Sequence, residues 1–262
     1  SCTLDDSPNQ IAITYNKMWR WLIKRLVRLV GVYISISPYL YNSALSLLPK
    51  KKVVFIPQGV QVPDLVGCAP LKIRERYGYG SDDIILLFVG GICVRKGVDV
   101  LIEGMPALVA CNRNVRLLIV GPVLEEDYAR DLEIRTVELG LQEHVGFAGP
   151  MNEVGDFYQL SDIMVFASHM EGFGNVLLEA MAFGMPVVSR RLPGVTDYFI
   201  EHNKTGYLFD NQQDYVDILK ILIDNPDIQQ AIGSAAREEV SKNFAMPMIA
   251  QRYIDLYSNK EA

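Results

Sequence analysis

The sequence predicts an α/β fold built on a doubly wound parallel sheet, and three observations support this prediction. From Ile84 onward, short β-rich apolar runs alternate with longer helical stretches, which is the pattern of repeated βαβ units. The runs are mostly apolar, as strands covered on both faces are. Half of the 262 residues are hydrophobic, so the chain can bury a sizeable core.

Six strands, with helices between and after them, are expected after residue 83. The expected strands are residues 84–89, 116–120, 144–147, 163–167, 186–189 and 206–209, each ending at Gly, Pro, Ser or a polar loop. The expected helices are residues 97–111, 127–139, 154–160, 176–183, 194–200 and 215–224, followed by further helices to the end. This alternation suits one Rossmann-like nucleotide-binding domain.

The region before residue 84 is too short and irregular for a second complete doubly wound domain. It offers an amphipathic helix at residues 11–29 and two short strands at 32–36 and 53–56. Residues 57–70 hold three prolines and two glycines, which indicates a linker. We therefore divide the chain into an incomplete segment at 1–60, a linker at 61–82, the nucleotide-binding domain at 83–245 and a closing helix at 246–262.

Composition argues against several classes of protein. A net charge of −6 argues against a nucleic-acid partner, because phosphate binding needs a dense field of Lys and Arg. Residues 1–10 do not resemble a signal peptide, and the most apolar stretch, 26–36, is shorter than the roughly 20 residues that span a bilayer. The four cysteines lack C-x-x-C spacing, which suggests reduced thiols. We therefore expect a cytoplasmic protein without a transmembrane helix.

The most informative segment, residues 169–188, passes from a strand through a glycine loop into a helix. Gly172 and Gly174 would let backbone N–H groups approach a ligand, and the helix start adds unpaired donors and a positive dipole end, a combination that binds phosphates. Glu179, about one turn into the helix, suits ribose hydroxyls, and Glu171 could meet a sugar. The alternative is an ordinary strand, turn and helix whose carboxylates are only solvated.

A second constellation follows the strand at residues 84–89. Gly90 and Gly91 lead to Arg95 and Lys96, just before a helix begins. Arg offers a forked charge and Lys a compact one, and both suit a diphosphate. An isolated pair of loop charges is more often only solvated. Position favours a ligand here, because ligands in open α/β sheets gather at the carboxyl ends of strands, where both loops lie.

Together these segments resemble the GT-B glycosyltransferases of the large family numbered four, over roughly residues 34–257. The family's paired glutamates, with seven residues between them, are matched by Glu171 and Glu179. Ser161-Asp162 with Ser168, and the run that begins at Lys96 and ends at Leu101, also fit family positions. The resemblance implies a retaining transfer of a hexosyl group from a nucleotide-diphosphate sugar to a hydroxyl acceptor, in cell-surface glycan or glycolipid synthesis.

The resemblance also implies roles for individual residues. Lys96 and the amides around Gly174 to Val176 would hold the donor diphosphate, Glu179 the ribose, and Glu171 would lie near the sugar. The implied donor-binding residues are Gly90, Gly91, Arg95, Lys96, Met151, Gly172, Phe173, Gly174, Asn175, Val176 and Glu179, with Glu171 and Lys96 as the catalytic residues. A UDP-sugar is the leading expectation for the donor, with residues 145–151 lining the base pocket.

No metal or other cofactor is expected. His144, His169 and His202 are scattered along the chain, and no Asp-x-Asp pair occurs.

Upstream, residues 33–37 and 54–60 resemble the last strands of the family's acceptor domain, so 1–60 would be part of that domain. The closing helix at 248–257, with Tyr253 and Tyr257 on one face, resembles one that packs back across the interdomain cleft. Two departures from the family are visible in the sequence. Gly91 replaces an Arg of the diphosphate loop, for which Arg95 could substitute. The first half of the acceptor domain, with a commonly used histidine, is not matched.

The expected partners are a nucleotide-sugar donor and a glycan or lipid-linked acceptor. The cations among apolar residues at 19–29 could lie on the inner face of the cell membrane, although an ordinary packed surface helix is the commoner explanation of such a pattern. A rival hypothesis is a donor-binding module without activity of its own, whose acceptor domain is a separate partner chain. A GT-B sugar-nucleotide epimerase is a further alternative, which the glutamate spacing and the Lys96 loop disfavour.

Overall fold

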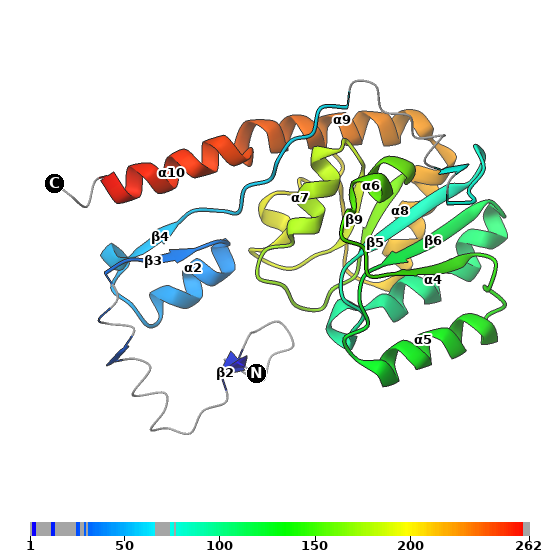
Figure 1. The fold of residues 1–262 in the computed structure, drawn as a ribbon, viewed down its shortest axis with the longest axis horizontal. Helices are drawn as coiled ribbons and strands as arrows, with labels where there is room; N and C mark the ends of the chain where they lie inside the picture. The colour runs from blue at the N-terminus through cyan, green and yellow to red at the C-terminus, as the bar shows by residue number, and fades with distance from the viewer. Residues whose placement is uncertain are drawn as a thin grey trace.

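The computed structural model describes residues 2–3, 12–13, 25–26, 29, 31–65, 74–75 and 77–258. A six-stranded sheet with helices on both faces forms the larger part, and a small βαβ module lies beside it (Figure 1). Helices α9 (Pro226–Asn243) and α10 (Met246–Ser258) follow one another along both parts. The carboxyl-terminal helix therefore returns to the module.

All strand pairs of the large sheet are parallel, in the order β10-β9-β8-β5-β6-β7. The strands are β5 (Ile84–Val89), β6 (Val115–Val120), β7 (Val145–Gly149), β8 (Ile163–Phe166), β9 (Val187–Arg190) and β10 (Tyr207–Phe209). All six strands predicted from the sequence are present, so the doubly wound fold is confirmed. The strand order reverses between β5 and β8, at the switch point where such sheets bind ligands.

Alternate residues of the central strands face two separate apolar cores. One face is covered by α4 (Val98–Cys111), α5 (Glu126–Glu138) and α8 (Gln212–Asp224), and the other by α6 (Gly155–Leu160), α7 (Asn175–Ala182) and α9. Leu86 and Phe88 of β5 lie in the first core, and Ile85 and Leu87 lie in the second. Since both faces are covered, these strands are continuous apolar runs in the sequence.

The helix expected at residues 194–200 is wrong, because only the three-residue 3₁₀ turn η3 (Thr196–Tyr198) forms there. The Thr196 hydroxyl accepts a hydrogen bond from Leu192 N and donates one to Arg190 O, both at 2.9 Å. Side-chain bonds of this kind compete with the backbone bonds of a helix. They hold an ordered loop after β9 instead.

Residues 31–56 form the small module. β3 (Tyr33–Ser35) pairs in parallel with β4 (Val53–Phe55), after the 3₁₀ turn η1 (Lys50–Lys52). Between the strands lies α2 (Pro38–Leu45), which the sequence analysis did not predict. The Ser37 hydroxyl caps this helix by accepting a hydrogen bond from Leu40 N at 3.3 Å. The signal was present as a serine followed by a proline, an N-cap residue before a proline at the first helical position.

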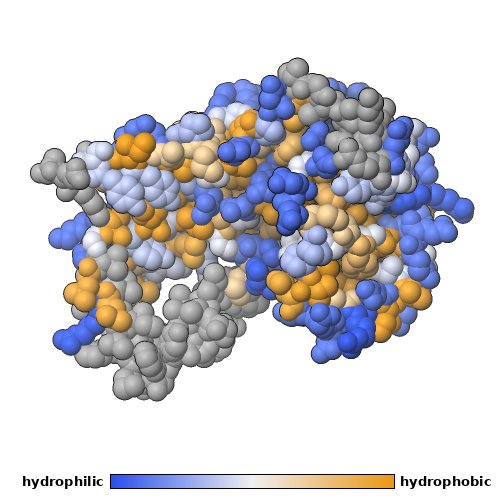
Figure 2. Space-filling model, viewed as in Figure 1, coloured by the Kyte–Doolittle hydropathy of each residue, from blue (hydrophilic) through white to orange (hydrophobic). Residues whose placement is uncertain are grey.

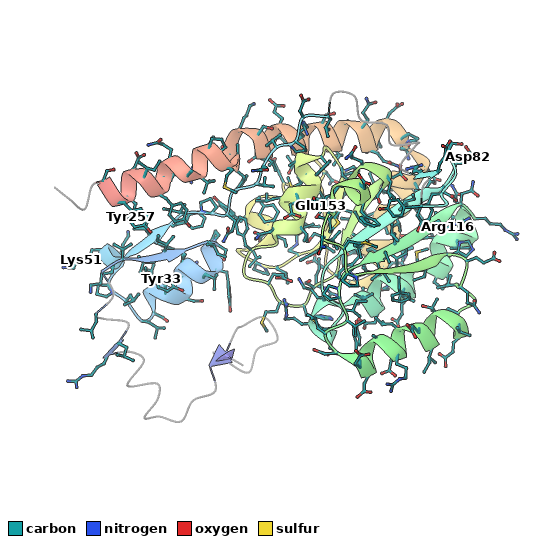
Figure 3. The ribbon with its side chains drawn as sticks, in the orientation of Figure 1. Tyr33, Lys51, Asp82, Arg116, Glu153 and Tyr257 are labelled. Atoms are coloured by element: carbon teal, nitrogen blue, oxygen red, sulfur yellow. The ribbon has the colours of Figure 1, made fainter. Side chains whose placement is uncertain are left out.

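The module turns the carboxyl ends of its strands toward the large sheet. Tyr39, just after β3, donates its backbone N–H to Gly194 O at 3.0 Å. Tyr33 and Lys51, at the amino ends of β3 and β4, lie at the other end of the molecule from Arg116 (Figure 3).

Apolar side chains are exposed on the module and on α10, and Figure 2 shows apolar patches in this part of the surface.

The predicted helix at residues 11–29 does not begin at residue 11, because β2 (Ala12–Ile13) pairs with β1 (Cys2–Thr3). Residues 25–26 and 29 are helical, and the rest of the segment lies outside the described residues, as do residues 66–73 of the predicted linker. The membrane contact predicted for residues 19–29 therefore stays a prediction. Among the described helices, none is both long and apolar enough to cross a bilayer.

The chain crosses between the module and the large sheet twice, and the two crossings touch. Val60 N donates to Phe244 O, and Met246 N donates to Val60 O, both at 2.9 Å. A Cβ added at Gly59 would lie 3.0 Å from the Cβ of Ile249. The closing helix predicted at 248–257 is confirmed as part of α10, which is buried at Ile249 and exposed at Tyr257.

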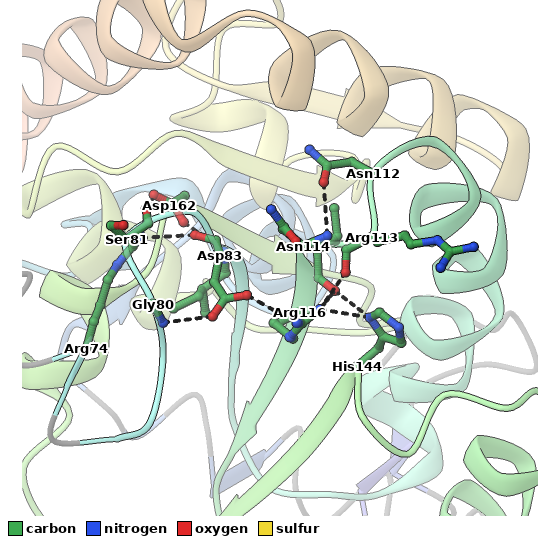
Figure 4. Close-up of polar contacts among 12 residues, drawn as sticks. Arg74, Gly80, Ser81, Asp83, Asn112, Arg113, Asn114, Arg116, His144 and Asp162 are labelled. Atoms are coloured by element: carbon green, nitrogen blue, oxygen red, sulfur yellow. Dashed lines mark hydrogen bonds and ion pairs between the residues drawn. The ribbon is translucent and has the colours of Figure 1, made fainter.

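Polar side chains join the amino ends of the central strands, opposite the switch point (Figure 4). Arg74 donates to Asp162 Oδ1 at 2.6 Å, and Asp162 Oδ2 accepts from Ile85 N at 2.7 Å. Arg116 pairs with Asp83 at 3.2 Å. Burial raises the pKa of the Asp162 carboxyl, and the hydrogen bond from Ile85 and the charge of Arg74 oppose that shift. The network ties the segment before the sheet to β5 and β8.

Candidate functional site

The two loops singled out in the sequence meet at the switch point of the sheet. Glu171 Oε1, in the loop after β8, accepts hydrogen bonds from Lys96 Nζ at 2.5 Å and from Arg95 Nη1 at 3.0 Å. Arg95 Nη1 also donates to Met170 O at 2.8 Å, and His169 N donates to Arg95 O at 2.8 Å. Residues 75 positions apart thus form one charged cluster.

Lys96 is held by a tight turn against β8. It ends the 3₁₀ turn η2 (Val94–Lys96), and Gly97 follows with a φ of 64°. A Cβ at Gly97 would lie 2.4 Å from Ala167 O, so only glycine allows this approach. The Lys96 side chain is 14% exposed, and its ammonium lies 5.7 Å from the centre of the Phe166 ring. Lys96 is therefore a fixed and partly desolvated cation, whereas the Arg95 side chain is 45% exposed.

Gly90 and Gly91 end β5 beside the cluster. A Cβ at Gly91 would come within 2.4 Å of Leu124 Cδ1, so the Leu124 side chain covers the position where the family has an arginine. Arg95 is directed to Glu171 and Met170. The structure therefore places one cation, Lys96, in a partly buried setting and a second, Arg95, in an exposed one.

The amino end of α7 lies at the end of the same loop. Gly174 has a φ of 100°, and no side chain caps the helix, so the backbone N–H groups of Asn175 and Val176 are among its unpaired first-turn donors. Gly172 faces the module, where a Cβ would lie 3.8 Å from Leu40 Cδ1. The loop thus offers a helix dipole and free amides beside the two cations.

Phe173 has a structural role that the sequence analysis did not foresee. The residue is 3% exposed, and its ring centroid lies 5.4 Å from that of Phe199 and 6.4 Å from that of Phe244. The ring therefore does not face a ligand in the loop. The aromatic side chain instead anchors the glycine loop in the core.

Glu179 is held by a tyrosine that the sequence analysis missed. Its Oε2 accepts a hydrogen bond from the Tyr158 hydroxyl at 2.8 Å, and the Tyr158 ring stacks on Phe183 with centroids 5.2 Å apart. Burial is the main cause that raises the pKa of Tyr158, and the charge of Glu179 raises it further. The hydroxyl therefore stays protonated and donates to Glu179, which fixes the position of the carboxylate. No spacing in the sequence relates residues on two different helices.

Arg190 is a second residue that the sequence analysis missed. It ends β9 and donates from Nε to Ala167 O at 3.0 Å, so it lies beside the loop after β8. Burial lowers the pKa of His169, and the charge of Arg190 adds to this effect. The signal was available, because Arg190 directly follows a predicted strand in the way that Arg95 and Lys96 follow another.

Met151 lies in a different place. It is 39% exposed and lines a cavity of about 260 Å³ with Tyr77, Tyr79 and residues 146–148 of β7. An aromatic and apolar cavity of this kind is compatible with a planar base, and its assignment as the base pocket stays a prediction. Among the described residues, no group of three His, Cys, Asp or Glu side chains is placed to hold a metal ion.

The doubly wound parallel sheet, with its paired loops at the switch point, places the chain in the class of GT-B glycosyltransferase folds. Residues 71–239 match the family described as glycosyl transferases group 1. The match spans more than half of the chain, so the chain belongs to this family.

Curated relatives share between a quarter and a third of the aligned residues. N-acetyl-alpha-D-glucosaminyl L-malate synthase of Bacillus anthracis is 28% identical over 188 residues, which are 71% of this chain and 48% of the relative. D-inositol 3-phosphate glycosyltransferase of Corynebacterium efficiens is 32% identical over 197 residues, covering 71% of this chain and 45% of the relative. The chain spans about half the length of these relatives.

Solved structures show the same fold. The complex of Anabaena Alr3699/HepE with UDP and glucose superimposes with a TM-score of 0.84 at 23% identity, covering 94% of this chain and 68% of that one. A glycosyltransferase from Rickettsia africae ESF-5 gives a TM-score of 0.83 at 21% identity, covering 94% and 67%. At these identities the likeness concerns the fold alone.

Proposed function

We propose that this chain binds a nucleotide-diphosphate sugar at the switch point and supplies the donor half of a retaining glycosyltransferase. The observation that carries the proposal is the meeting of Lys96, Arg95 and the uncapped amino end of α7 around Glu171. Two cations and a helix dipole are what a diphosphate requires. The carboxylates of Glu171 and Glu179 suit the hydroxyls of a sugar and a ribose.

The transfer then follows from this placement. The bond between the sugar C1 and the diphosphate oxygen breaks, and a bond from C1 to the acceptor hydroxyl oxygen forms on the same face of the sugar. The acceptor proton passes to the departing diphosphate, so no side-chain base is needed. Lys96 and the α7 amides stabilise the charge that develops on the diphosphate, and Glu171 orients the sugar.

Glu171 also sets the electrostatic balance of the site. One of its oxygens accepts from both cations, so a diphosphate has to compete with this carboxylate for Lys96 and Arg95. Once the diphosphate neutralises the cations, the Glu171 carboxylate is available to the sugar hydroxyls. The same pair of loops thereby serves both halves of the donor.

A UDP-sugar is the donor that we expect, with a hexosyl group transferred to a glycan or lipid-linked hydroxyl acceptor in cell-surface synthesis. The complexes of Anabaena Alr3699/HepE with UDP, with UDP and glucose, and with UDP-glucose support this choice through the shared fold. No metal enters the proposed reaction, because the cations of the site are Lys96 and Arg95.

Calorimetric titration with UDP, GDP and ADP tests the donor site. We expect one nucleotide to bind, and we expect Lys96→Ala and Glu179→Ala each to weaken it by about 1–3 kcal/mol, the cost of losing a hydrogen bond to a charged group. Lys204→Ala is the matched control, since Lys204 is an exposed lysine paired with Glu201. If none of the three nucleotides binds, the proposed donor site is wrong.

A second candidate is a donor-binding module whose acceptor domain is a separate chain. The described residues of the module contain a sheet of only two strands, and Leu26, Leu29 and Ile254 are each more than half exposed. Such open strand edges and apolar surface favour a protein partner. Self-association of the purified chain in sedimentation velocity would support this candidate, and a monodisperse monomer would count against it.

A further inference from the structure

A small pocket opens beside the charged cluster, between the module and the large sheet. Its volume is about 80 Å³, and it is lined by Tyr39, His169, Glu171, Leu192, Pro193 and Val195 among others. Glu171 belongs both to this pocket and to the pair with Lys96. A sugar that is attached to a diphosphate at Lys96 would therefore lie at the mouth of the pocket.

The walls of the pocket are fixed. Tyr39 N donates to Gly194 O at 3.0 Å, and Gly194 has a φ of 70°, where an added Cβ would lie only 2.9 Å from Tyr39 N. The loop that carries Leu192 and Val195 is held by hydrogen bonds from Leu192 N to Thr196 Oγ1 and from Gly194 N to Asp197. Leu192 and Val195 are themselves buried. The shape of the pocket is thus set before any ligand binds.

The size of the pocket limits what can enter it. The pocket is several-fold smaller than the roughly 300–1,000 Å³ of sites that enclose a whole small-molecule ligand, so it suits a substituent of a sugar better than a pyranose ring. Leu192, Pro193 and Val195 give it an apolar wall on one loop, and His169 and Glu171 line it from another. A hydroxyl pushed against Leu192 and Val195 would lose its hydrogen bonds to water without replacement. A substituent that is polar where it joins the sugar and ends in a methyl group fits this arrangement of polar and apolar residues.

We propose that this pocket receives the acetamido group of the donor sugar, so that the donor is a nucleotide-diphosphate N-acetylhexosamine. The acetyl methyl lies against Tyr39, Leu192 and Val195, and the amide faces His169. A donor with a hydroxyl in place of the acetamido group leaves the pocket unfilled. This inference rests on the proposed function, because it needs the diphosphate to bind at Lys96.

Titration of the chain with UDP and with two matched pairs of donors tests the inference. The pairs are UDP-glucose with UDP-N-acetylglucosamine, and UDP-galactose with UDP-N-acetylgalactosamine. In at least one pair we expect the acetamido sugar to bind about tenfold tighter or more, since small apolar groups in fitted pockets are discriminated to this degree. Saturation-transfer NMR should then show the acetyl methyl as the most strongly saturated group of the sugar.

A variant that narrows the pocket provides the second arm. Met170 also lines it, and we expect Met170→Phe to abolish the preference for the acetamido sugar, measured as the ratio of the two affinities within a pair. Met248→Phe on α10 is the matched control and should leave the preference intact. If UDP binds but neither pair shows a preference for the acetamido sugar, the inference is overturned and the donor site is not. If UDP does not bind, the proposed donor site and the inference about the acetamido group are both wrong. The binding of UDP alone therefore distinguishes a failure of the donor site from a failure of this inference.

Discussion

Glu171 is the residue to which both cations of the site are bonded. Its carboxylate accepts hydrogen bonds from a partly buried lysine and an exposed arginine through a single oxygen. Two cations so close together repel each other, and the shared carboxylate relieves that repulsion. The carboxylate is therefore a structural counter-ion as well as the predicted sugar ligand, and these two roles make opposite predictions for a substitution.

Glu171→Gln should strengthen the binding of free UDP, which has no sugar to contact residue 171. Removal of the negative charge leaves Lys96 and Arg95 available to the diphosphate, and we expect an increase in affinity of about threefold to tenfold, in the range of one ordinary hydrogen bond. Calorimetric titration measures it. Glu201→Gln, at an exposed pair with Lys204, is the control. Weaker binding of UDP to Glu171→Gln would show that the carboxylate mainly positions the two cations.

Charged residues of the site could be predicted from the sequence where they lie in a loop that follows a predicted strand. Lys96 and Glu171 were singled out from glycine loops after two strands, and the structure brings them to 2.5 Å. Tyr158 could not be predicted, because its contact with Glu179 joins two helices through tertiary packing. Phe173 was expected among the donor-binding residues because of its place in the glycine loop, but the sequence does not show which way its side chain points, and the structure buries it.

At the scale of elements, the turn η2 depends on one glycine. Gly97 has a φ of 64° and leaves no room for a Cβ beside Ala167 O, whereas Gly140, with a φ of 68°, has nothing within 4 Å of the Cβ position. The two glycines thus share a backbone conformation and differ only in the space around them. Alanine substitutions at these two glycines therefore separate the free-energy cost of backbone strain from that of a steric clash.

Gly97→Ala should lower the free energy of unfolding by more than about 3 kcal/mol and weaken UDP binding, because the turn that carries Lys96 has to move away from β8. Gly140→Ala should cost only about 1–2 kcal/mol, the strain of a left-handed alanine, and should leave UDP binding unchanged. Urea denaturation and titration measure the two effects. Equal costs for both variants would contradict the close approach at Ala167.

The elements themselves were predicted with unequal success, and the reasons are physical. The central strands β5 and β8 are buried on both faces, so each is a continuous apolar run that the sequence reveals. The expected helix at 194–200 failed because Thr196 bonds to the loop backbone. Helix α2 was overlooked because its eight residues are partly exposed and show only weak periodicity, although its cap was visible.

At the scale of the whole molecule, Arg74 joins the segment before the sheet to the end of the sheet opposite the site. Its Nε donates to Leu160 O at 2.7 Å, and its guanidinium pairs with Asp162, whose side chain is 28% exposed. Both contacts lie more than 80 residues away in the sequence. Arg74 thus fixes the segment before the sheet to residues that are distant in the sequence.

Arg74→Ala should lower the free energy of unfolding by about 2–4 kcal/mol, since Asp162 and the Leu160 carbonyl would lose a buried partner. Affinity for UDP at the opposite end of the strands should stay within about twofold. Arg135→Ala removes exposed pairs and should cost less than about 1 kcal/mol. Thermal unfolding and titration together measure the result. A large loss of UDP binding at temperatures where Arg74→Ala is folded would refute the separation of the two ends.

The paired crossings at Val60 and Phe244 restrict how the module can move relative to the large sheet. Two bodies joined at a single point can tilt in any direction, whereas the module is also held by the bond from Tyr39 N to Gly194 O and by the Phe55 ring, whose centroid lies 5.2 Å from that of Tyr198. Any tilt of the module would have to break at least one of these contacts. The wall that Tyr39 gives to the pocket beside Glu171 is therefore kept in place by contacts outside the pocket as well as within it.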